Sequence, residues 1–179
     1  MRASTPLRLR CPDRGDVEQL LAWENDPAVW KFGWAWRPLA HSEMLDYVER
    51  QLGSTPFGMG GARLLLHFEG EAPLGVVDLY DLNPLHLRAG VGLLIADPES
   101  RGRGYGTAAL ELVKQYAFDH LLLHQLFASV QSDNQPSLSL FTAQGFQPCG
   151  TRKHWFRGQH GWTDELLLQC FSNRHHDRT

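Results

Sequence analysis

A short segment rich in glycine and arginine, residues 101–107, carries the clearest chemical signal in the sequence. It consists of Arg-Gly-Arg-Gly-Tyr-Gly-Thr and precedes a run whose apolar residues recur with helical spacing. Glycines let a backbone approach a ligand and expose successive N–H groups, and the positive end of a following helix dipole favours an anion such as a pyrophosphate. Arg101 and Arg103 add positive charge at the same place. The pattern predicts an anion-binding loop.

Two familiar phosphate motifs do not fit this segment. A GxGxxG motif would need a glycine at Thr107, and a Walker A loop would need Gly-Lys followed by serine or threonine. A plain surface loop and an arginine-glycine contact to RNA remain alternatives at this point. The RNA contact is disfavoured, because such contacts come in repeated segments and this one is single and lies between regular elements.

Length and composition describe an ordinary globular protein. The chain has 179 residues, 42% of them hydrophobic and 21% charged, which predicts one domain over residues 1–179. The formal net charge is −3 and the pI is about 6.3. Nucleic acid is therefore an unlikely partner, because phosphate binding needs a concentrated basic excess, and a cationic substrate fits better.

The chain shows no sequence sign of a membrane, a metal or a disulfide framework. No apolar run approaches the roughly 20 residues of a membrane span, so we expect a soluble, cytoplasmic protein. The three cysteines have no CxxC spacing and the nine histidines have no ligand spacing, so we predict no metal site. Cys149 is expected to be buried and inert.

Hydrophobic periodicity predicts a mixed α/β (α+β) chain with elements in the order β-α-α-β-β-β-α-β-α-β-β. A glycine- and proline-rich loop is expected over residues 53–61, and a helix of about four turns is expected after the glycine segment. The predicted helices begin after Asp13, at His41, after Gly106 and at Asn134. The predicted strands cover residues 7–10, 63–68, 74–80, 90–96, 126–130, 147–156 and 162–171.

The glycine segment resembles the acyl-CoA loop of GNAT (GCN5-related) N-acetyltransferases. Arg101-x-x-Gly104-x-Gly106 matches that family's Q/R-x-x-G-x-G/A motif. The resemblance covers nearly the whole chain and is closest to the RimJ/RimL and spermidine acetyltransferase branch. Further matching pieces are residues 23–27, 75–83 and 134–146. The resemblance implies a mostly antiparallel sheet of about six to seven strands, splayed at the middle and flanked by about four helices.

The resemblance also implies acetyl-CoA as cosubstrate and assigns residues to it. Backbone groups of residues 102–107 should hold the pyrophosphate, and residues 93–95 should run beside the pantetheine like an added strand. Asn134 should contact the pantetheine arm, although it could equally be a simple helix cap. The expected acetyl-CoA contacts are Leu93, Leu94, Ile95, Arg101, Gly102, Arg103, Gly104, Tyr105, Gly106, Thr107 and Asn134.

Acyl transfer to an amine needs a base and a stabilised oxyanion. Asp78 and Asp81 are three residues apart, and therefore on opposite faces of a regular strand. Asp81 is preferred as the base because it matches an acidic position of the spermidine enzymes, although an Asp beside Asn83-Pro84 could be only a turn residue. For the oxyanion, the resemblance implies a backbone N–H of residues 93–95.

The leaving thiolate also needs a proton. Counting back from Gly145, the position where the family usually carries an acidic tyrosine is Phe141, which has no proton to give. Ser137 is the expected substitute, because residues 134–137 match the Asn-x-x-Ser of RimL-like enzymes. Its alternative role is that of an ordinary residue in the first turn of a helix.

Three functions can be compared on these grounds. The first is an N-acetyltransferase in which a polyamine such as spermidine, or a protein N-terminal amine, attacks directly within a ternary complex. The second is a CoA-binding module with weak or no catalysis, suggested by Phe141 and by Gly90, which stands where spermidine enzymes tend to carry a strand glutamate. The third, nucleic-acid binding, conflicts with the net charge. Glu24, Asp26, Asp78 and Asp81 could attract a cationic acceptor, and a homodimer is left open.

Overall fold

A single seven-stranded sheet forms the centre of the computed structural model, which describes residues 6–30, 37–158 and 161–173. The strand order is β1-β2-β3-β4-β5-β7-β6, and every neighbouring pair is antiparallel except β4 and β5. The strands are β1 (Leu7–Arg10), β2 (Ala62–Phe68), β3 (Gly75–Asn83), β4 (Arg88–Ile95), β5 (Gln125–Gln131), β6 (Gln147–Gly158) and β7 (Gly161–Phe171). The expected sheet is confirmed.

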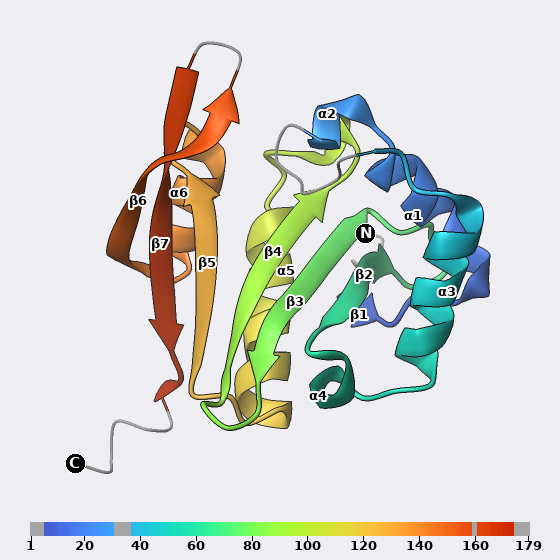
Figure 1. Cartoon of the computed structure of the whole chain (residues 1–179). Coiled ribbons are helices and arrows are strands. Elements are labelled where there is room, and N and C mark those ends of the chain that lie inside the picture. The colour runs from blue at the N-terminus through green and yellow to red at the C-terminus, as the bar shows by residue number, and fades with distance from the viewer. Residues whose placement is uncertain (1–5, 31–36, 159–160, 174–179) are drawn as a thin grey trace, which may run out of the picture.

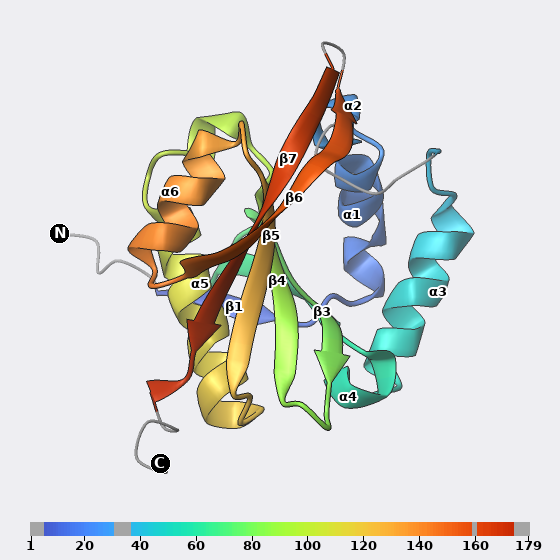
Figure 2. The ribbon, with the colours of Figure 1, turned by 60° about the vertical axis from the view of Figure 1, so that its left-hand side comes forward.

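Helices cover both faces of this sheet (Figure 2). On one face lie α1 and α3, and on the other lie α5 and α6. The α-helices are α1 (Val17–Glu24), α2 (Pro27–Trp30), α3 (His41–Leu52), α4 (Pro56–Met59), α5 (Tyr105–Gln115) and α6 (Gln135–Ala143). The 3₁₀-helices are η1 (Arg14–Asp16) and η2 (Pro98–Ser100), and the π-helix η3 (Tyr116–His120) continues α5.

The sheet divides between its two parallel strands. Pairing between β4 and β5 runs from Arg88 opposite Gln125 to Gly90 opposite Phe127. Beyond that pair the strands diverge, whereas β4 stays paired with β3 as far as Ile95 opposite Gly75 (Figure 1). We call the Gly90–Phe127 pair the vertex and the diverging stretch the split. The expected splay of the sheet is therefore present.

Two separate cores support the two faces. Alternate strand residues such as Val77 and Leu126 point toward α5 and α6, where Leu110 and Phe146 close the larger core. The smaller core lies under α1 and α3 and centres on Leu65. At about 25 cal/mol per Å² of apolar surface, each fully buried leucine contributes about 2 kcal/mol.

Local sequence signals explain most of the helix ends. Asn134 caps α6 by accepting from the Ser137 N–H at 3.2 Å, and Gly145 follows the helix with a φ of 86°, in the left-handed region. The loop expected over residues 53–61 was wrong in part, because Thr55 and Pro56 start the one-turn helix α4. Helix α2 was also not predicted.

The entry to α1 is fixed by an ion pair with β1. Both guanidinium nitrogens of Arg10 donate to the Asp16 carboxylate, at 2.6 and 2.7 Å. These hydrogen bonds hold the pKa of Asp16 below its ordinary value, although burial acts in the opposite direction.

The described residues contain no helix long and apolar enough to cross a membrane.

Candidate active site

The glycine segment forms the loop between the open end of β4 and the start of α5. Gly102 and Gly104 have φ values of 71° and 84°, which residues with a side chain rarely adopt. Gly104 is also the N-cap of α5, so the unpaired N–H groups of the first helical turn follow it directly. A carboxylate or phosphate at this place would meet backbone donors and the positive end of the helix dipole.

Arg101 has a structural task that the sequence did not predict. Its Nε donates to the carbonyl of Ile95 at 3.0 Å and its Nη2 to the carbonyl of Ala96 at 3.3 Å. The guanidinium therefore ties the loop to the end of β4. Arg103 is exposed beside it and helps to lower the pKa of Asp97, after the larger effects of the Glu99 N–H and the Ser100 hydroxyl.

Gly106 brings α5, α6 and β4 close together. A Cβ built there would lie 3.0 Å from a methyl carbon of Leu140 and 3.5 Å from one of Leu93. Tyr105 turns toward β2, where its ring meets Phe68 edge-on at 5.7 Å between centroids, and Thr107 is exposed. The structure thus brings the predicted loop residues to the mouth of the split.

Residues 93–95 line β4 beyond the vertex. Leu93 and Ile95 pack against the larger core and Leu94 against the smaller one, so the strand presents side chains to both faces. Their backbone pairs with β3 on one side. The other side of the strand faces the split, which leaves backbone groups available for an extended ligand.

Ser137 and Phe141 both belong to α6 but have different surroundings. Phe141 is buried and meets Phe146 edge-on at 5.0 Å between centroids, so it is part of the core. Ser137 is half-buried in the first turn, where its N–H bonds Asn134. Asn134 is therefore a helix cap.

An ion network lies on the face of the sheet that α1 and α3 cover. Arg63 of β2 donates to both carboxylate oxygens of Asp78 at 2.7 and 2.9 Å and to Glu24 at 2.5 Å. Burial alone would lower the pKa of Arg63, but Asp78 and Glu24 raise it above its ordinary value, so the cation is permanent. Two of the four acidic residues expected to attract a cationic acceptor are thus bound to a cation of the protein itself.

Helix α3 completes this network through Gln51. Its side chain accepts from the Arg63 N–H at 2.9 Å and donates to the Arg63 carbonyl at 2.7 Å, as a neighbouring strand would. The Tyr47 ring lies 5.8 Å from the Arg63 guanidinium. Sequence reasoning missed Arg63, because its partners Glu24 and Asp78 lie 39 and 15 residues away along the chain.

Asp81 lies at a β-bulge next to the vertex, on the side where β4 and β5 are still paired. The register between β3 and β4 shifts between Tyr80 and Asn83, and Asp81 has a φ of 48° and is exposed. Bulges often re-aim a side chain beside an active site. The Asp81 carboxylate lies close enough to the Tyr80 phenol to raise its pKa, as a lesser cause after burial. Asp26 instead accepts from the Ala28 N–H at 2.8 Å, at the start of α2.

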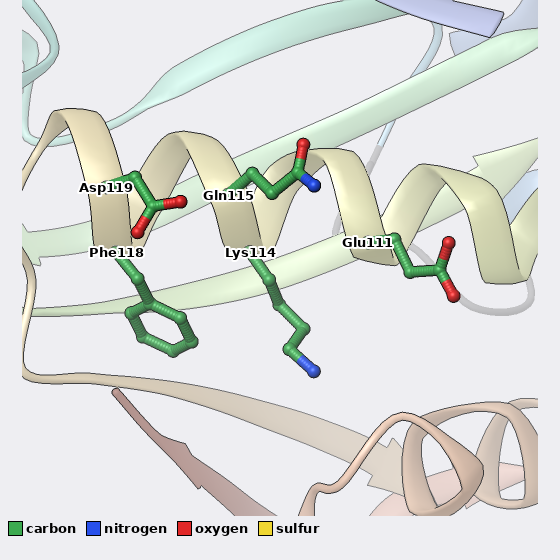
Figure 3. Close-up of a pocket in the computed structure, with 5 residues that line it drawn as sticks. All are labelled: Glu111, Lys114, Gln115, Phe118 and Asp119. Atoms are coloured by element: carbon green, nitrogen blue, oxygen red, sulfur yellow. The ribbon is translucent and has the colours of Figure 1, made fainter. Parts of the chain in front are cut away.

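The hollows on the helices lie outside the split. One, of about 260 Å³, lies on α5 and η3, and Figure 3 shows Lys114 and Phe118 pointing to the same side of the helix. Lys114 is held there by the Gln144 carbonyl at 2.7 Å. A second, on α3, is lined by Glu43, Asp46, Glu49 and Arg50.

Neither a metal centre nor a disulfide is formed by the described residues. Those residues bring no group of three histidine, cysteine or acidic side chains close enough to hold a metal ion. The three cysteines are free, and Cys149 is exposed rather than buried as expected. It lies on β6, where its Sγ is 3.4 Å from the Leu167 carbonyl.

Comparison with known proteins agrees with this geometry. Residues 6–147 match the family model described as an acetyltransferase (GNAT) domain. The spermidine N(1)-acetyltransferase of Escherichia coli K12 is 27% identical over 157 residues, which are 87% of this chain and 81% of that protein. Its Vibrio cholerae counterpart is 24% identical over 143 residues, 80% of each.

A solved structure has the same fold. The spermidine N-acetyltransferase from Vibrio cholerae in complex with CoA and spermine superposes with a TM-score of 0.83 at 20% identity, covering 94% of this chain and 97% of that one. A dodecameric structure of the Vibrio cholerae enzyme gives a TM-score of 0.81 at 20% identity, covering 98% and 99%.

Proposed function

The chain belongs to the GNAT family of acetyltransferases, and on that premise we propose that it transfers the acetyl group of acetyl-CoA to a polyamine such as spermidine. A protein N-terminal amine is the second acceptor class. The split, with the glycine loop at its mouth and an acidic side chain at its vertex, is the observation that carries the proposal. The amine attacks directly, in a ternary complex.

The described residues fit acetyl-CoA. Gly102 and Gly104 border open space, since no atom lies within 4 Å of a Cβ built at either position, and the start of α5 that follows suits a pyrophosphate. The side of β4 that faces the split suits the amides of the pantetheine arm, which can bond like an added strand. The bound thioester supplies the activated acetyl group. Asn134 and residues 93–95 would hold its arm.

Three tasks fall to the residues around the split. A backbone N–H of residues 93–95 stabilises the oxyanion, Asp81 accepts the proton of the amine, and Ser137 donates to the sulfur. Asp81 suits the base because its carboxylate is exposed at the vertex, whereas Asp78 is bound by Arg63. A base held beside the amine avoids the need for a strongly alkaline solution, since free primary amines have a pKa near 10.

The choice of a polyamine rests on charge and on the relatives. Asp81 at the vertex is acidic, and the Glu24, Asp78 and Arg63 network adds one further net negative charge on the same half of the molecule. Two relatives that match most of the chain, from Escherichia coli K12 and Vibrio cholerae, are spermidine N(1)-acetyltransferases. A polyamine is a flexible cation that such a surface attracts from solution.

A CoA-binding module without turnover is the second candidate. It is favoured by Phe141, whose buried ring holds no proton donor, and by Gly90, which by the resemblance stands where spermidine enzymes tend to carry a strand glutamate. A CoA thiol, with a pKa of about 8.5, is a tolerable leaving group even without a proton donor, so we place this candidate second.

Thiol release from acetyl-CoA tests the proposal. Spermidine, spermine, a short peptide with a free N-terminus and the same peptide with a blocked N-terminus would be compared at equal concentration. Steady thiol release that is faster with the polyamines than with the blocked peptide supports the proposal. Binding of CoA without release for any amine supports the second candidate, and absence of CoA binding contradicts both.

Assembly and compartment belong to the same proposal. We propose the cytoplasm as the compartment and leave a homodimer open as the assembly. The Vibrio cholerae enzyme has a dodecameric structure. The molar mass of this chain's assembly, measured by light scattering, would distinguish a dimer from a dodecamer.

A further inference from the structure

Tyr80 of β3 reaches across β4 to β5 at the vertex. It is opposite Gly90, which in turn is opposite Phe127 in the last β4–β5 pair. Its ring meets Phe127 edge-on at 5.6 Å between centroids. Ser129, on β5 beyond the vertex, lies close enough to the Tyr80 hydroxyl for its side chain and backbone to lower the pKa of the phenol. One side chain thus spans three strands where the sheet divides.

Gly90 leaves the space that this ring occupies. A Cβ built at Gly90 would lie 2.3, 2.4 and 2.7 Å from three carbons of the Tyr80 ring. Side-chain carbons do not come so close in packed proteins. The Tyr80 ring therefore needs a glycine at position 90, and its hydroxyl places a polar group at the vertex.

The surroundings of Tyr80 keep its phenol protonated. Burial raises the pKa of the phenol, the side chain and backbone of Ser129 lower it by less, and the carboxylates of Asp81 and Glu165 raise it further. Glu165 is itself paired with Arg152 at 2.5 Å, on the two strands beyond β5. Because the net shift is upward from about 10, the phenol remains a donor at neutral and mildly alkaline pH.

The position of the vertex matches where the thiol end of CoA would lie, so this inference rests on the proposed function. The glycine loop adjoins Ile95 through Arg101. Gly90 lies about 16 Å from Ile95 along the strand at roughly 3.3 Å per residue, a distance comparable with an extended pantetheine arm. We propose that the Tyr80 hydroxyl, steadied by Ser129, donates a hydrogen bond and then a proton to the sulfur as CoA leaves.

The step balances without another reactant. The amine nitrogen forms the C–N bond, the C–S bond breaks, and its electron pair goes to sulfur. The phenolic proton of Tyr80 neutralises that sulfur, and the proton released by the amine passes to Asp81 and then to solvent, which reprotonates the phenolate. Tyr80 approaches from β3 and Ser137 from α6, so the two donors come from different elements.

The substitution Tyr80→Phe tests the proposal because it keeps the ring over Gly90 and removes only the hydroxyl. We expect kcat to fall by about 10²-fold or somewhat less, the lower end for general acids. The dissociation constant of CoA should change by less than about threefold, a small difference in binding free energy. Tyr116→Phe is the matched control, because Tyr116 is half-buried on η3 and stacks on His120 at 5.5 Å. It should leave kcat unchanged.

A binding measurement without turnover gives a second test. The thiol of CoA bound to the protein can be titrated through the ultraviolet absorbance of its thiolate. A donor beside the sulfur stabilises the thiolate, so its pKa should be higher in Tyr80→Phe than in the wild type. Tyr116→Phe should titrate like the wild type.

The outcomes separate this inference from the proposed function. Unchanged kcat and unchanged thiol pKa in Tyr80→Phe, with normal CoA binding, would overturn the role of Tyr80 and leave the proposed function standing. Loss of CoA binding in the wild type would overturn both. A lower kcat with an unchanged thiol pKa would also overturn proton donation, because the loss of kcat would then come from altered packing rather than from a missing donor.

Discussion

The glycine loop leads into α5 on one face of the sheet, the Arg63 network lies on the other face, and the two are built in different ways. The loop depends on consecutive residues whose backbone angles and helix position follow from the local sequence. The network joins α1, β2 and β3 through Glu24, Arg63 and Asp78. The comparison teaches that a backbone site is encoded locally, whereas a side-chain site depends on the complete fold.

The largest effect should follow from a change in the loop. Gly104→Asp introduces a side chain at a left-handed residue and a carboxylate at the start of α5, where the pyrophosphate would bind. We expect the dissociation constant of CoA to rise by at least about 10²-fold, equivalent to about 2.7 kcal/mol. Calorimetry measures it.

Gly70→Asp is the control for this change. Gly70 has a φ of 78° in the exposed β2–β3 turn, so the conformational cost is similar. CoA should bind this variant normally. Equal affinities for the two variants would mean that the loop does not contact the anion.

The next effect concerns the stability that the Arg63 network provides on the other face of the sheet. Arg63→Met leaves Asp78 and Glu24 without their shared cation in a largely buried position. The free energy of unfolding should fall by about 2 to 4 kcal/mol, somewhat below the range for fully buried pairs because the carboxylates are partly exposed. Urea unfolding measures it.

Arg8→Met provides the comparison for Arg63. Arg8 pairs with Glu69 at 3.2 Å, but both side chains are more than half exposed, so its loss should cost less than about 1 kcal/mol. If both variants lost the same stability, the network would be no stronger than a surface ion pair.

A smaller effect is expected at the vertex. Asp81→Asn keeps a residue that tolerates a positive φ and removes the proposed base. We expect kcat with spermidine to fall by about 10-fold at neutral pH, less than the usual range for a base because water can partly replace it. In alkaline buffer the difference in kcat between the wild type and Asp81→Asn should become smaller, since more of the amine is then already neutral. A constant ratio of kcat values from neutral to alkaline pH would argue against Asp81 as base.

The smallest effect should come from Ser137→Ala. A second donor at Tyr80 would share its task, so we expect only a few-fold loss of kcat, well below the usual contribution of a general acid. Ser139→Ala on the exposed side of α6 is the control. A loss larger than that of Tyr80→Phe would reverse the order of the two donors.

Much of the architecture could be predicted from sequence because its signals are local. Alternation of apolar residues marked the strands, Asn134 and Gly145 marked the ends of α6, and the glycine segment marked the start of α5. The network could not be predicted, because Gln51, Arg63 and Asp78 meet only after α3 packs beside β2. The anchoring role of Arg101 was missed for a related reason. Its charge suggested an anion, and only the fold brings it to the Ile95 carbonyl.

Amide hydrogen exchange, with and without CoA, tests most directly whether CoA binds in the split. Slower exchange is expected in residues 102–107 and in residues 91–95 of β4, whereas residues 88–90, which already pair with β5, should change little. Exchange in the hollow on α3, at Glu43 and Glu49, should also be unaffected. Protection confined to α3, or none at residues 91–95 with CoA at saturation, would contradict the account.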